Sequence, residues 1–170
     1  MEEAARLAAA ISIPIAAAGL LPHLGFWGWE SLWQGIRTVF TLWYFIPGLV
    51  LTVVLHEGLH ALGFRLFGRA PVDSIHFGID RQTFSPYAGC QAPMSARAYR
   101  LALLLPALLL GLLPLVAGWI TATGWMTVLG TLQLLGAAGD FVTYRAFDSV
   151  PATARVLDHP DRVGCRVIDG

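Results

Sequence analysis

The sequence has little charge and contains no lysine or asparagine. Of its 170 residues, 13% are charged and 56% are hydrophobic, whereas about a quarter of the residues in an average soluble domain are charged. All 11 basic residues are arginines and 11 acidic residues balance them, so the chain lacks the basic stripe that nucleic-acid binding requires. We therefore expect a membrane protein that does not bind nucleic acid.

Cysteine is scarce as well, since the chain contains only Cys90 and Cys165. Two cysteines are too few for a disulfide framework, and a reducing cytosol keeps such residues as thiols. The apolar N-terminal run has no clear small-residue cleavage site followed by a hydrophilic domain. We therefore interpret this run as a retained membrane anchor and not as a signal peptide.

Long uncharged runs are the dominant feature that is present. No side chain between Arg6 and Glu30 is charged, and none in residues 101–139 is charged. Because about 20 apolar residues cross a bilayer as a helix, the chain has room for four transmembrane helices. The expected spans are 5–22, 34–67, 97–120 and 125–147. We expect Pro14 to kink the first of them.

Two segments between the spans differ from this pattern. Residues 23–33 carry three tryptophans, whose rings favour the headgroup region, so we expect an interfacial loop there. Residues 71–93 contain three prolines and two short β-prone runs, 74–77 and 83–84, around a turn at 78–81. This pattern predicts a small β-hairpin or re-entrant insert over about 72–88, near a cavity.

The sequence thus predicts an all-α polytopic membrane protein with a small strand insert between the second and third spans. With four spans, ten arginines fall on one side of the membrane and only Arg37 falls on the other. The positive-inside rule then places both termini in the cytoplasm. Residues 1–147 would form the transmembrane domain and residues 148–170 a polar cytoplasmic tail. No internal repeat supports an inverted-repeat transporter.

The most informative string is His-Glu-Gly-Leu-His at 56–60, inside the second expected span. On a helix, His56 and His60 lie on one face, so both imidazoles can bind one metal ion while Glu57 lies beside them. Zinc suits these ligands and lowers the pKa of a water toward ~7. Glu57 would accept the proton of that water as general base. Each charged group in such a helix costs about 2.5–3.5 kcal/mol, which indicates a functional role.

A zinc site of this kind needs a third protein ligand. Asp140 is the only acidic residue of the third and fourth spans, and it follows four small residues at 136–139. A small-residue face lets another helix approach closely. The expected ligands of one zinc ion per chain are therefore His56, His60 and Asp140.

Structural alternatives remain open for the same residues. The two histidines of the motif could be neutral interface residues at a helix end, with Glu57 paired to an arginine. Asp140 could instead pair with Arg145 or Arg100 at the cytoplasmic interface. In these alternatives the residues stabilise the fold and bind no metal.

Four further candidates carry weaker signals. His76 could reach the metal or a substrate, or could pack as a polar side chain in a strand. Cys90 could be an extra, inhibitory or redox-sensitive ligand, or a buried thiol. Gln133, two turns before Asp140, could hydrogen-bond substrate backbone or another helix. Residues 158–160, Asp-His-Pro, could bind metal, although their place in a polar tail favours a turn.

The metal-binding string joined to Asp140 through hydrophobic spans resembles the intramembrane zinc metalloproteases of the site-2 protease class. More narrowly, the chain resembles a small bacterial and archaeal family of zincin peptidases, formerly a domain of unknown function. The matching segments run in order over about 54–166, and the first span lies outside them. They are His56–Leu62, Phe77-Gly78, Tyr87-Ala88, Cys90, Pro93–Ser95, Tyr99-Arg100, Pro106, Gly139-Asp140, Asp158–Pro160 and Gly164.

The resemblance implies an active site at the cytosolic leaflet, with zinc on the residues matching His56, His60 and Asp140 and with Glu57 as base. In the wider class, the transmembrane segment of the substrate is thought to unwind and add as a strand. Here residues 72–88 would receive it through main-chain hydrogen bonds. One departure is that the wider class has an Asn-Pro-Asp-Gly type motif at its third ligand, whereas this chain has Gly-Asp-Phe.

We therefore expect a zinc-dependent intramembrane endopeptidase of a prokaryotic cytoplasmic membrane. Its partners would be the lipid bilayer and membrane-anchored protein substrates, cleaved near the cytoplasmic leaflet. The alternative is a non-catalytic zinc-binding membrane protein that acts as a sensor or scaffold. A metal transporter is disfavoured because its pathway should place ionisable residues along several spans, whereas here they cluster at one depth.

Overall fold

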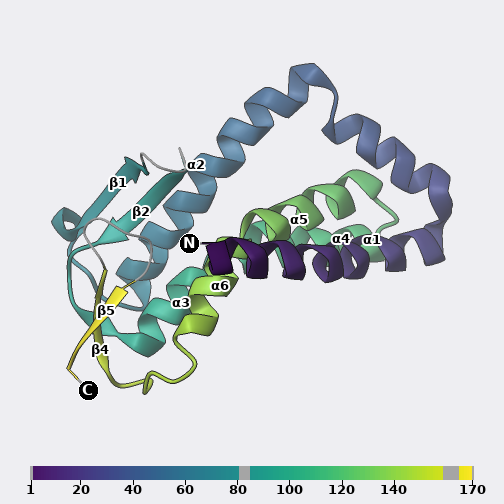
Figure 1. The fold of residues 1–170 in the computed structure, drawn as a ribbon. Helices are drawn as coiled ribbons and strands as arrows, with labels where there is room; N and C mark the ends of the chain where they lie inside the picture. The colour runs from purple at the N-terminus through teal and green to yellow at the C-terminus, as the bar shows by residue number, and fades with distance from the viewer. Residues whose placement is uncertain (1, 81–84, 159–164, 170) are drawn as a thin grey trace. The chain divides into compact units, whose positions relative to one another are not determined.

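A computed structural model of the chain describes residues 2–80, 85–158 and 165–169, and these residues are mostly helical (Figure 1). Their contacts form two compact units. The first comprises Met1–Thr52 and Ala107–Val142, and the second comprises Val53–Pro106 and Thr143–Gly170. We describe each unit by itself.

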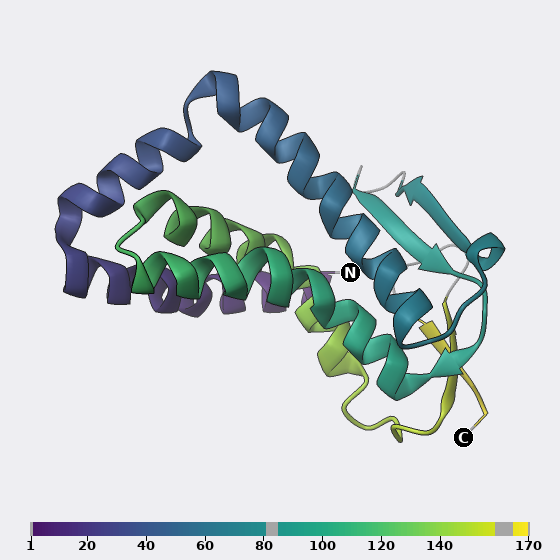
Figure 2. The same cartoon turned by 180° about the vertical axis from the view of Figure 1, so that it is seen from behind.

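The first unit contains three helical segments that pack together, besides the beginnings of the two helices that continue into the second unit. Helix α1 (Glu2–Val39) packs along α5 (Gly124–Gly136), and α4 (Leu113–Ile120) packs along α5 in the opposite direction (Figure 2). A π-helical stretch, η2 (Ala107–Leu112), leads directly into α4. The segments are joined by a tight turn between α4 and α5, which keeps these two helices adjacent.

Glycines allow close contacts between the helices of this unit. A methyl group on Gly118 would lie 2.6 Å from the backbone nitrogen of Thr127, and one on Gly111 would lie 2.6 Å from Cδ2 of Leu134. These small residues therefore permit close packing of η2 and α4 against α5.

The interfacial loop predicted at 23–33 is wrong, because these residues of α1 are helical except at Gly28, where a kink joins two helical stretches. His23 is fully buried; its Nδ1 lies 2.8 Å from Oγ1 of Thr127, and its Nε2 lies 3.0 Å from Oγ of Ser31. These bonds hold the segment against α5 as helix. The irregularity is instead confined to Gly28, where φ is 78°, a left-handed conformation that suits glycine.

The boundary between the first two long helices also differs from the prediction. The second span was expected to begin at residue 34, but α1 continues to Val39 and α2 comprises Leu42–Leu66. The hydroxyl of Thr38 donates to the carbonyl of Gln34, and that of Thr41 donates to the carbonyl of Arg37. Such side-chain bonds compete with the helical ladder and favour a helix end.

Among the residues that the structure describes, three helices are long and apolar enough to cross a membrane, and four spans are not confirmed. They are Arg6–Val39, Trp43–Leu66 and Ala96–Ile120. A fourth span exists only if α5 and α6 (Ala138–Ala146) are counted as one bent helix. The chain is therefore compatible with a location in a membrane.

The continuous helix predicted over 125–147 is wrong, because α5 and α6 meet at a bend of 43°. The bend lies at Ala137, between two glycines that weaken a helix. Among the described residues, no atom lies within 4 Å of a methyl group placed on Gly136 or Gly139. These small residues therefore mark a bend and do not form the close helix contact that was expected.

The second unit contains the predicted hairpin. After a short 3₁₀ turn, η1 (Val72–Ser74), strand β1 (Ile75–Ile79) pairs antiparallel with β2 (Pro86–Cys90). The hairpin is confirmed, but β1 extends to Ile79, so the turn does not begin at residue 78. The predicted strand residues 83–84 lie outside the described residues.

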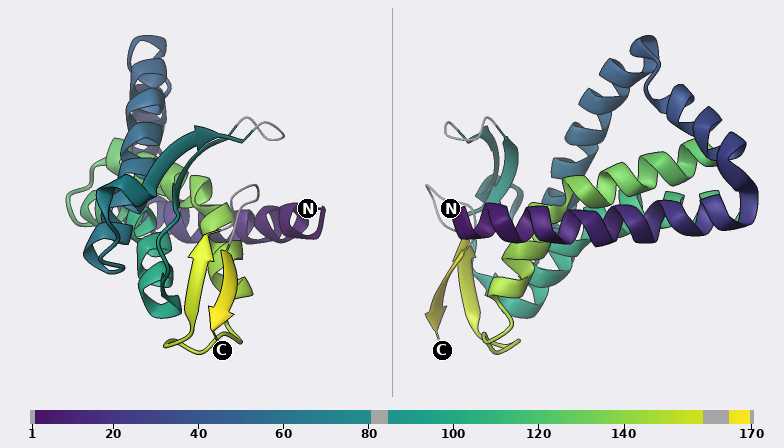
Figure 3. Two further views of the ribbon diagram at one scale, coloured as in Figure 1. Left: turned by 90° about the vertical axis from the view of Figure 1, so that its left-hand side faces the viewer. Right: turned by 45° about the vertical axis from the view of Figure 1, so that its right-hand side comes forward.

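A second sheet lies in the same unit and was not predicted. Strand β4 (Arg155–Asp158) pairs with both β3 (Met94–Ser95) and β5 (Cys165–Asp169), as the left view of Figure 3 shows for β4 and β5. Val156 of β4 is fully buried in the hydrophobic core. The predicted polar tail thus contributes two strands and a core residue, so the all-α description needs this correction. The domain boundary at residue 147 stays a prediction.

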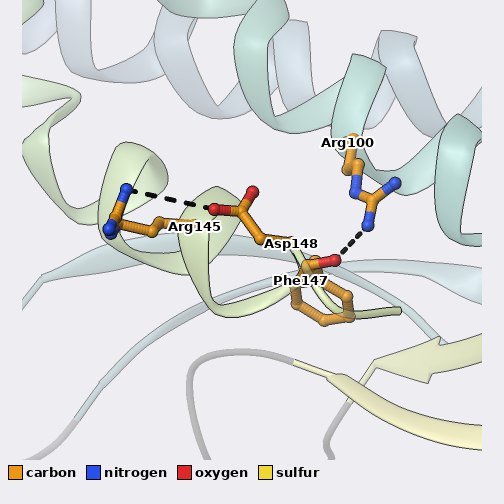
Figure 4. Close-up of polar contacts among 4 residues, drawn as sticks. All are labelled: Arg100, Arg145, Phe147 and Asp148. Atoms are coloured by element: carbon orange, nitrogen blue, oxygen red, sulfur yellow. Dashed lines mark hydrogen bonds and ion pairs between the residues drawn. The ribbon is translucent and has the colours of Figure 1, made fainter. Parts of the chain in front are cut away.

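Helix α3 (Ala96–Pro106) is tied to the segment that follows α6 by Arg100. The Nη2 of Arg100 donates to the carbonyl of Phe147 (Figure 4) and, at 2.7 Å, to that of Val150. The neighbouring pair of Arg145 and Asp148, also drawn in Figure 4, is 4.0 Å apart and its side chains are exposed. Arg100 therefore binds the chain just after α6, whereas Arg145 forms an exposed ion pair.

Replacing Arg100 with glutamine should destabilise the fold by about 2 kcal/mol, because charge-assisted hydrogen bonds to two carbonyls are lost. The matched control is Arg145→Gln, which should change stability by less than about 1 kcal/mol, as expected of an exposed ion pair. Unfolding of the detergent-solubilised variants, followed by helical circular dichroism, measures both. Equal destabilisation by the two substitutions would contradict this role of Arg100.

Candidate metal centre

The two histidines of the motif lie on one face of α2, one turn apart. Their Nε2 atoms are 3.2 Å apart, and the two rings meet edge to face at 77°. The two rings are close because α2 is helical throughout 56–60, and residues four apart on a helix lie on the same face. His60 is buried and His56 is partly buried.

The protonation of His60 follows from its second ring nitrogen. Nδ1 of His60 lies 3.0 Å from the carbonyl oxygen of Ala102 in α3. A carbonyl can only accept, so Nδ1 carries the proton, and Nε2 of the neutral ring keeps its lone pair directed toward His56. Histidine ligands of metals commonly donate their other N–H to a backbone carbonyl in this way.

Asp140 completes a group of three ligands. One donor atom each from His56, His60 and Asp140 lies within 4.8 Å of the other two. Asp140 belongs to the first turn of α6, a helix that continues across the division between the units after Val142. The bend at Ala137 directs the chain into this helix. The group is close enough to share one ion.

The donor set fits zinc. Two ligands bound at about 2.0–2.1 Å in tetrahedral geometry lie about 3.3 Å apart, and the separation of the two imidazole nitrogens is 3.2 Å. Two imidazoles and a carboxylate are ligands that catalytic zinc sites use, with a further position left for water. Glu57 follows His56 in α2, is partly buried and is not a member of the group.

The arginines named in the alternative roles have other partners. Arg100 donates to the carbonyls of Phe147 and Val150, and Arg145 pairs with Asp148. The structural roles that the sequence left open for Asp140 stay open.

The structure does not bring the weaker candidates into this group. His76 of β1 lies edge-on to Tyr87, and its buried Nδ1 has no hydrogen-bond partner among the described residues. Gln133 of α5 lines a cavity of about 220 Å³ whose other walls are almost entirely apolar. Cys90 is fully buried, with its Sγ near the hydroxyl of Ser74. The functional roles suggested for these residues stay predictions.

Sequence reasoning missed the structural role of Asp158. Its Oδ2 accepts from the backbone N–H of Cys90 at 2.9 Å, and its Oδ1 accepts from the hydroxyl of Tyr99 at 3.0 Å. Burial, together with this carboxylate, raises the pKa of the Cys165 thiol to about 12. Cys165 of the metal-free protein is therefore a neutral thiol at pH 7. His159 lies outside the described residues.

The group of His56, His60 and Asp140 could hold a metal ion, and comparison with known families supports a metallopeptidase. A model of the family described as "Putative zincin peptidase" matches residues 49–155, which is more than half of the chain. The chain belongs to this zincin peptidase family. The family implies zinc, and the three residues that could hold a metal ion lie within the matched region.

A curated relative gives no further functional information. The chain is similar to an uncharacterized 24.7 kDa protein from the gap 5' region of Pyrococcus woesei, with 27% identity over 119 residues. The similarity covers 69% of this chain and 52% of that protein, so the chain spans about half the length of this relative. No solved structure matches the chain.

Proposed function

We propose that the protein is a zinc-dependent endopeptidase that hydrolyses peptide bonds of membrane-anchored proteins within the membrane. The observation that carries this proposal is the group of His56, His60 and Asp140, whose donor atoms lie within 4.8 Å of one another. His56 and His60 belong to a helix long and apolar enough to span a membrane. Ionisable groups in such a helix are expensive and usually functional.

Three residues of the chain would hold the metal, and a fourth would move protons. Zinc held by His56, His60 and Asp140 would supply a Lewis acid for water activation and carbonyl polarisation. Glu57 would accept one proton from the attacking water and pass it to the leaving amine nitrogen. The new C–O bond forms at the carbonyl carbon before the C–N bond breaks, so the products are a carboxylic acid and an amine.

A hydrogen bond fixes the imidazole ring of His60 in the orientation that metal binding requires. Its Nδ1–H is held by the Ala102 carbonyl, which fixes both the tautomer and the direction of Nε2. A ligand that needs no reorientation lowers the cost of assembling the site. Helix α3 thus holds the imidazole ring of His60 in α2 through the Ala102 carbonyl, which is not itself one of the proposed metal ligands.

The substrate would bind in extended form. The β1–β2 sheet has two strands, and Phe77 and Ile79 of β1 are 63% and 66% exposed. Strand addition to such a sheet supplies main-chain hydrogen bonds with little demand on side-chain identity. His76, with its unpartnered Nδ1, and Gln133, in its apolar cavity, are the side chains proposed to contact the substrate.

The site would face the cytoplasmic leaflet of a prokaryotic membrane, with both termini in the cytoplasm. The support is the arginine distribution, which for four spans leaves only Arg37 on the opposite side. The fourth span in this topology is the bent pair of α5 and α6.

The test is cleavage in a defined membrane. The purified full chain is reconstituted into liposomes with a library of single-pass transmembrane proteins, and new peptide termini are identified by mass spectrometry. We expect termini inside transmembrane segments that vanish with a zinc chelator and return when zinc is restored. A wild-type protein that binds zinc and produces no new termini would instead be the non-catalytic sensor or scaffold.

A further inference from the structure

Helices α2 and α3 make an unusually close backbone contact beside the metal centre. A methyl group placed on Gly63 of α2 would lie 2.7 Å from Cα and 2.8 Å from Cβ of Ala102 in α3. Both distances are shorter than side-chain carbons tolerate, and Ala102 is fully buried. No side chain larger than that of glycine therefore fits at position 63 without moving one of the helices.

The same residue of α3 also holds the metal ligand. The Ala102 carbonyl accepts the Nδ1–H of His60 at 3.0 Å, and Gly63 lies three residues after His60 on α2. Residues three apart on a helix are neighbours on its surface. The close contact and the hydrogen bond thus belong to one place where the two helices meet.

We propose that Gly63 is a positioning residue of the metal centre. Having no side chain, it lets the α3 backbone approach until the Ala102 carbonyl holds His60 as its Nδ1–H tautomer, with Nε2 left to bind metal. This inference rests on the metal centre of the proposed function, and it concerns the orientation of one ligand and not the cleavage reaction.

A methyl group at position 63 changes this geometry in a definite direction. The overlap with Ala102 pushes α3 away from α2, and the carbonyl moves with it. A hydrogen bond of 3.0 Å weakens steeply as it is stretched. Loss of such an outer partner lowers metal affinity by about 10–100-fold.

The chain offers a matched control in the same helix. A methyl group on Gly48 would meet no described atom within 4 Å. The variants Gly63→Ala and Gly48→Ala both replace a glycine of α2 with alanine, so both gain the same helix propensity. They differ in the contact with Ala102.

The affinity test titrates the full-length, detergent-solubilised protein with Zn²⁺ in competition with a chromophoric chelator. We expect Gly63→Ala to raise the Kd for Zn²⁺ by about 10–100-fold and Gly48→Ala to change it by less than about twofold. The double variant Gly63→Ala with Ala102→Gly removes one of the colliding methyl groups and should recover part of the affinity. A folded Gly63→Ala protein with wild-type affinity would overturn the proposal.

A second readout needs neither zinc nor activity. Imidazole ¹⁵N resonances of the metal-free protein distinguish the Nδ1–H and Nε2–H tautomers. His60 of the wild type should be the Nδ1–H tautomer, and Gly63→Ala should populate both. If Gly63→Ala does not fold, the wild-type spectrum and the double variant decide, and an Nε2–H tautomer of His60 in the wild type overturns the proposal. A wild type that binds no zinc but shows the Nδ1–H tautomer would contradict the proposed function alone.

Discussion

Replacing Glu57 with glutamine should lower the rate of peptide hydrolysis by about 10²–10⁴-fold while the protein keeps its zinc. An amide has the shape of the carboxylate, but it cannot accept the proton of the attacking water. Glu57 is not a member of the ligand group, so the three donors remain in place. Cleavage rate in liposomes and zinc content of the same preparation measure the two halves of this result.

Glu30 provides the control for this experiment. It is an exposed acidic residue of α1 that accepts a hydrogen bond from Gln34, and Glu30→Gln should leave both the rate and the zinc content unchanged. A Glu57→Gln protein that retains more than about a tenth of the activity would contradict the role of general base. Loss of zinc from that variant would make Glu57 a ligand.

The variant Asp140→Ala should lose its zinc. Loss of a hydrogen-bond partner of a ligand lowers metal affinity by about 10–100-fold. Removal of one of the three donors themselves should lower the affinity for zinc further. His56→Ala and His60→Ala should behave alike, because each removes one member of the same group. The readout is the zinc content per chain, measured by inductively coupled plasma mass spectrometry after loosely bound metal has been removed.

The control for this series is Asp148→Ala. Asp148 is close to Asp140 in the sequence, but its side chain is 62% exposed and pairs with Arg145 at the surface. We expect this variant to keep one zinc per chain. If Asp140→Ala also keeps its zinc, the third ligand is another residue.

The proximity of the two histidines could be predicted from the sequence, because residues four apart on a helix lie on one face. The string at 56–60 is enough to place His56 and His60 on one face of α2, and the structure puts their Nε2 atoms 3.2 Å apart. Asp140 was predicted by elimination among the charged residues of the later spans. The structure brings it to the same place, by way of a bend that the prediction did not contain.

The parts that sequence reasoning missed depend on long-range contacts. Strand β4 was assigned to a polar tail because a strand of four residues with one fully buried side chain, Val156, carries almost no periodic signal. Its partner β3 lies some sixty residues earlier in the chain. Likewise, the helix through residues 23–33 depends on bonds from His23 to Thr127, which no local pattern indicates.

The contact between Gly63 and Ala102 could not be predicted from the sequence either. A glycine inside an apolar helix usually indicates a weak point of that helix. Only the structure shows that this one faces the residue whose carbonyl holds His60.

The central claim is that two imidazoles and one carboxylate hold a single zinc ion, and X-ray absorption at the zinc edge of the purified wild-type protein tests it most directly. The predicted spectrum has only nitrogen and oxygen neighbours at about 2.0–2.1 Å, with the outer-shell scattering of two imidazole rings. A sulfur neighbour at about 2.3 Å, which would bring in a cysteine such as Cys90, contradicts the claim. A spectrum with only one imidazole bound to the zinc also contradicts the claim. A protein that holds no zinc after the metal is supplied contradicts it as well.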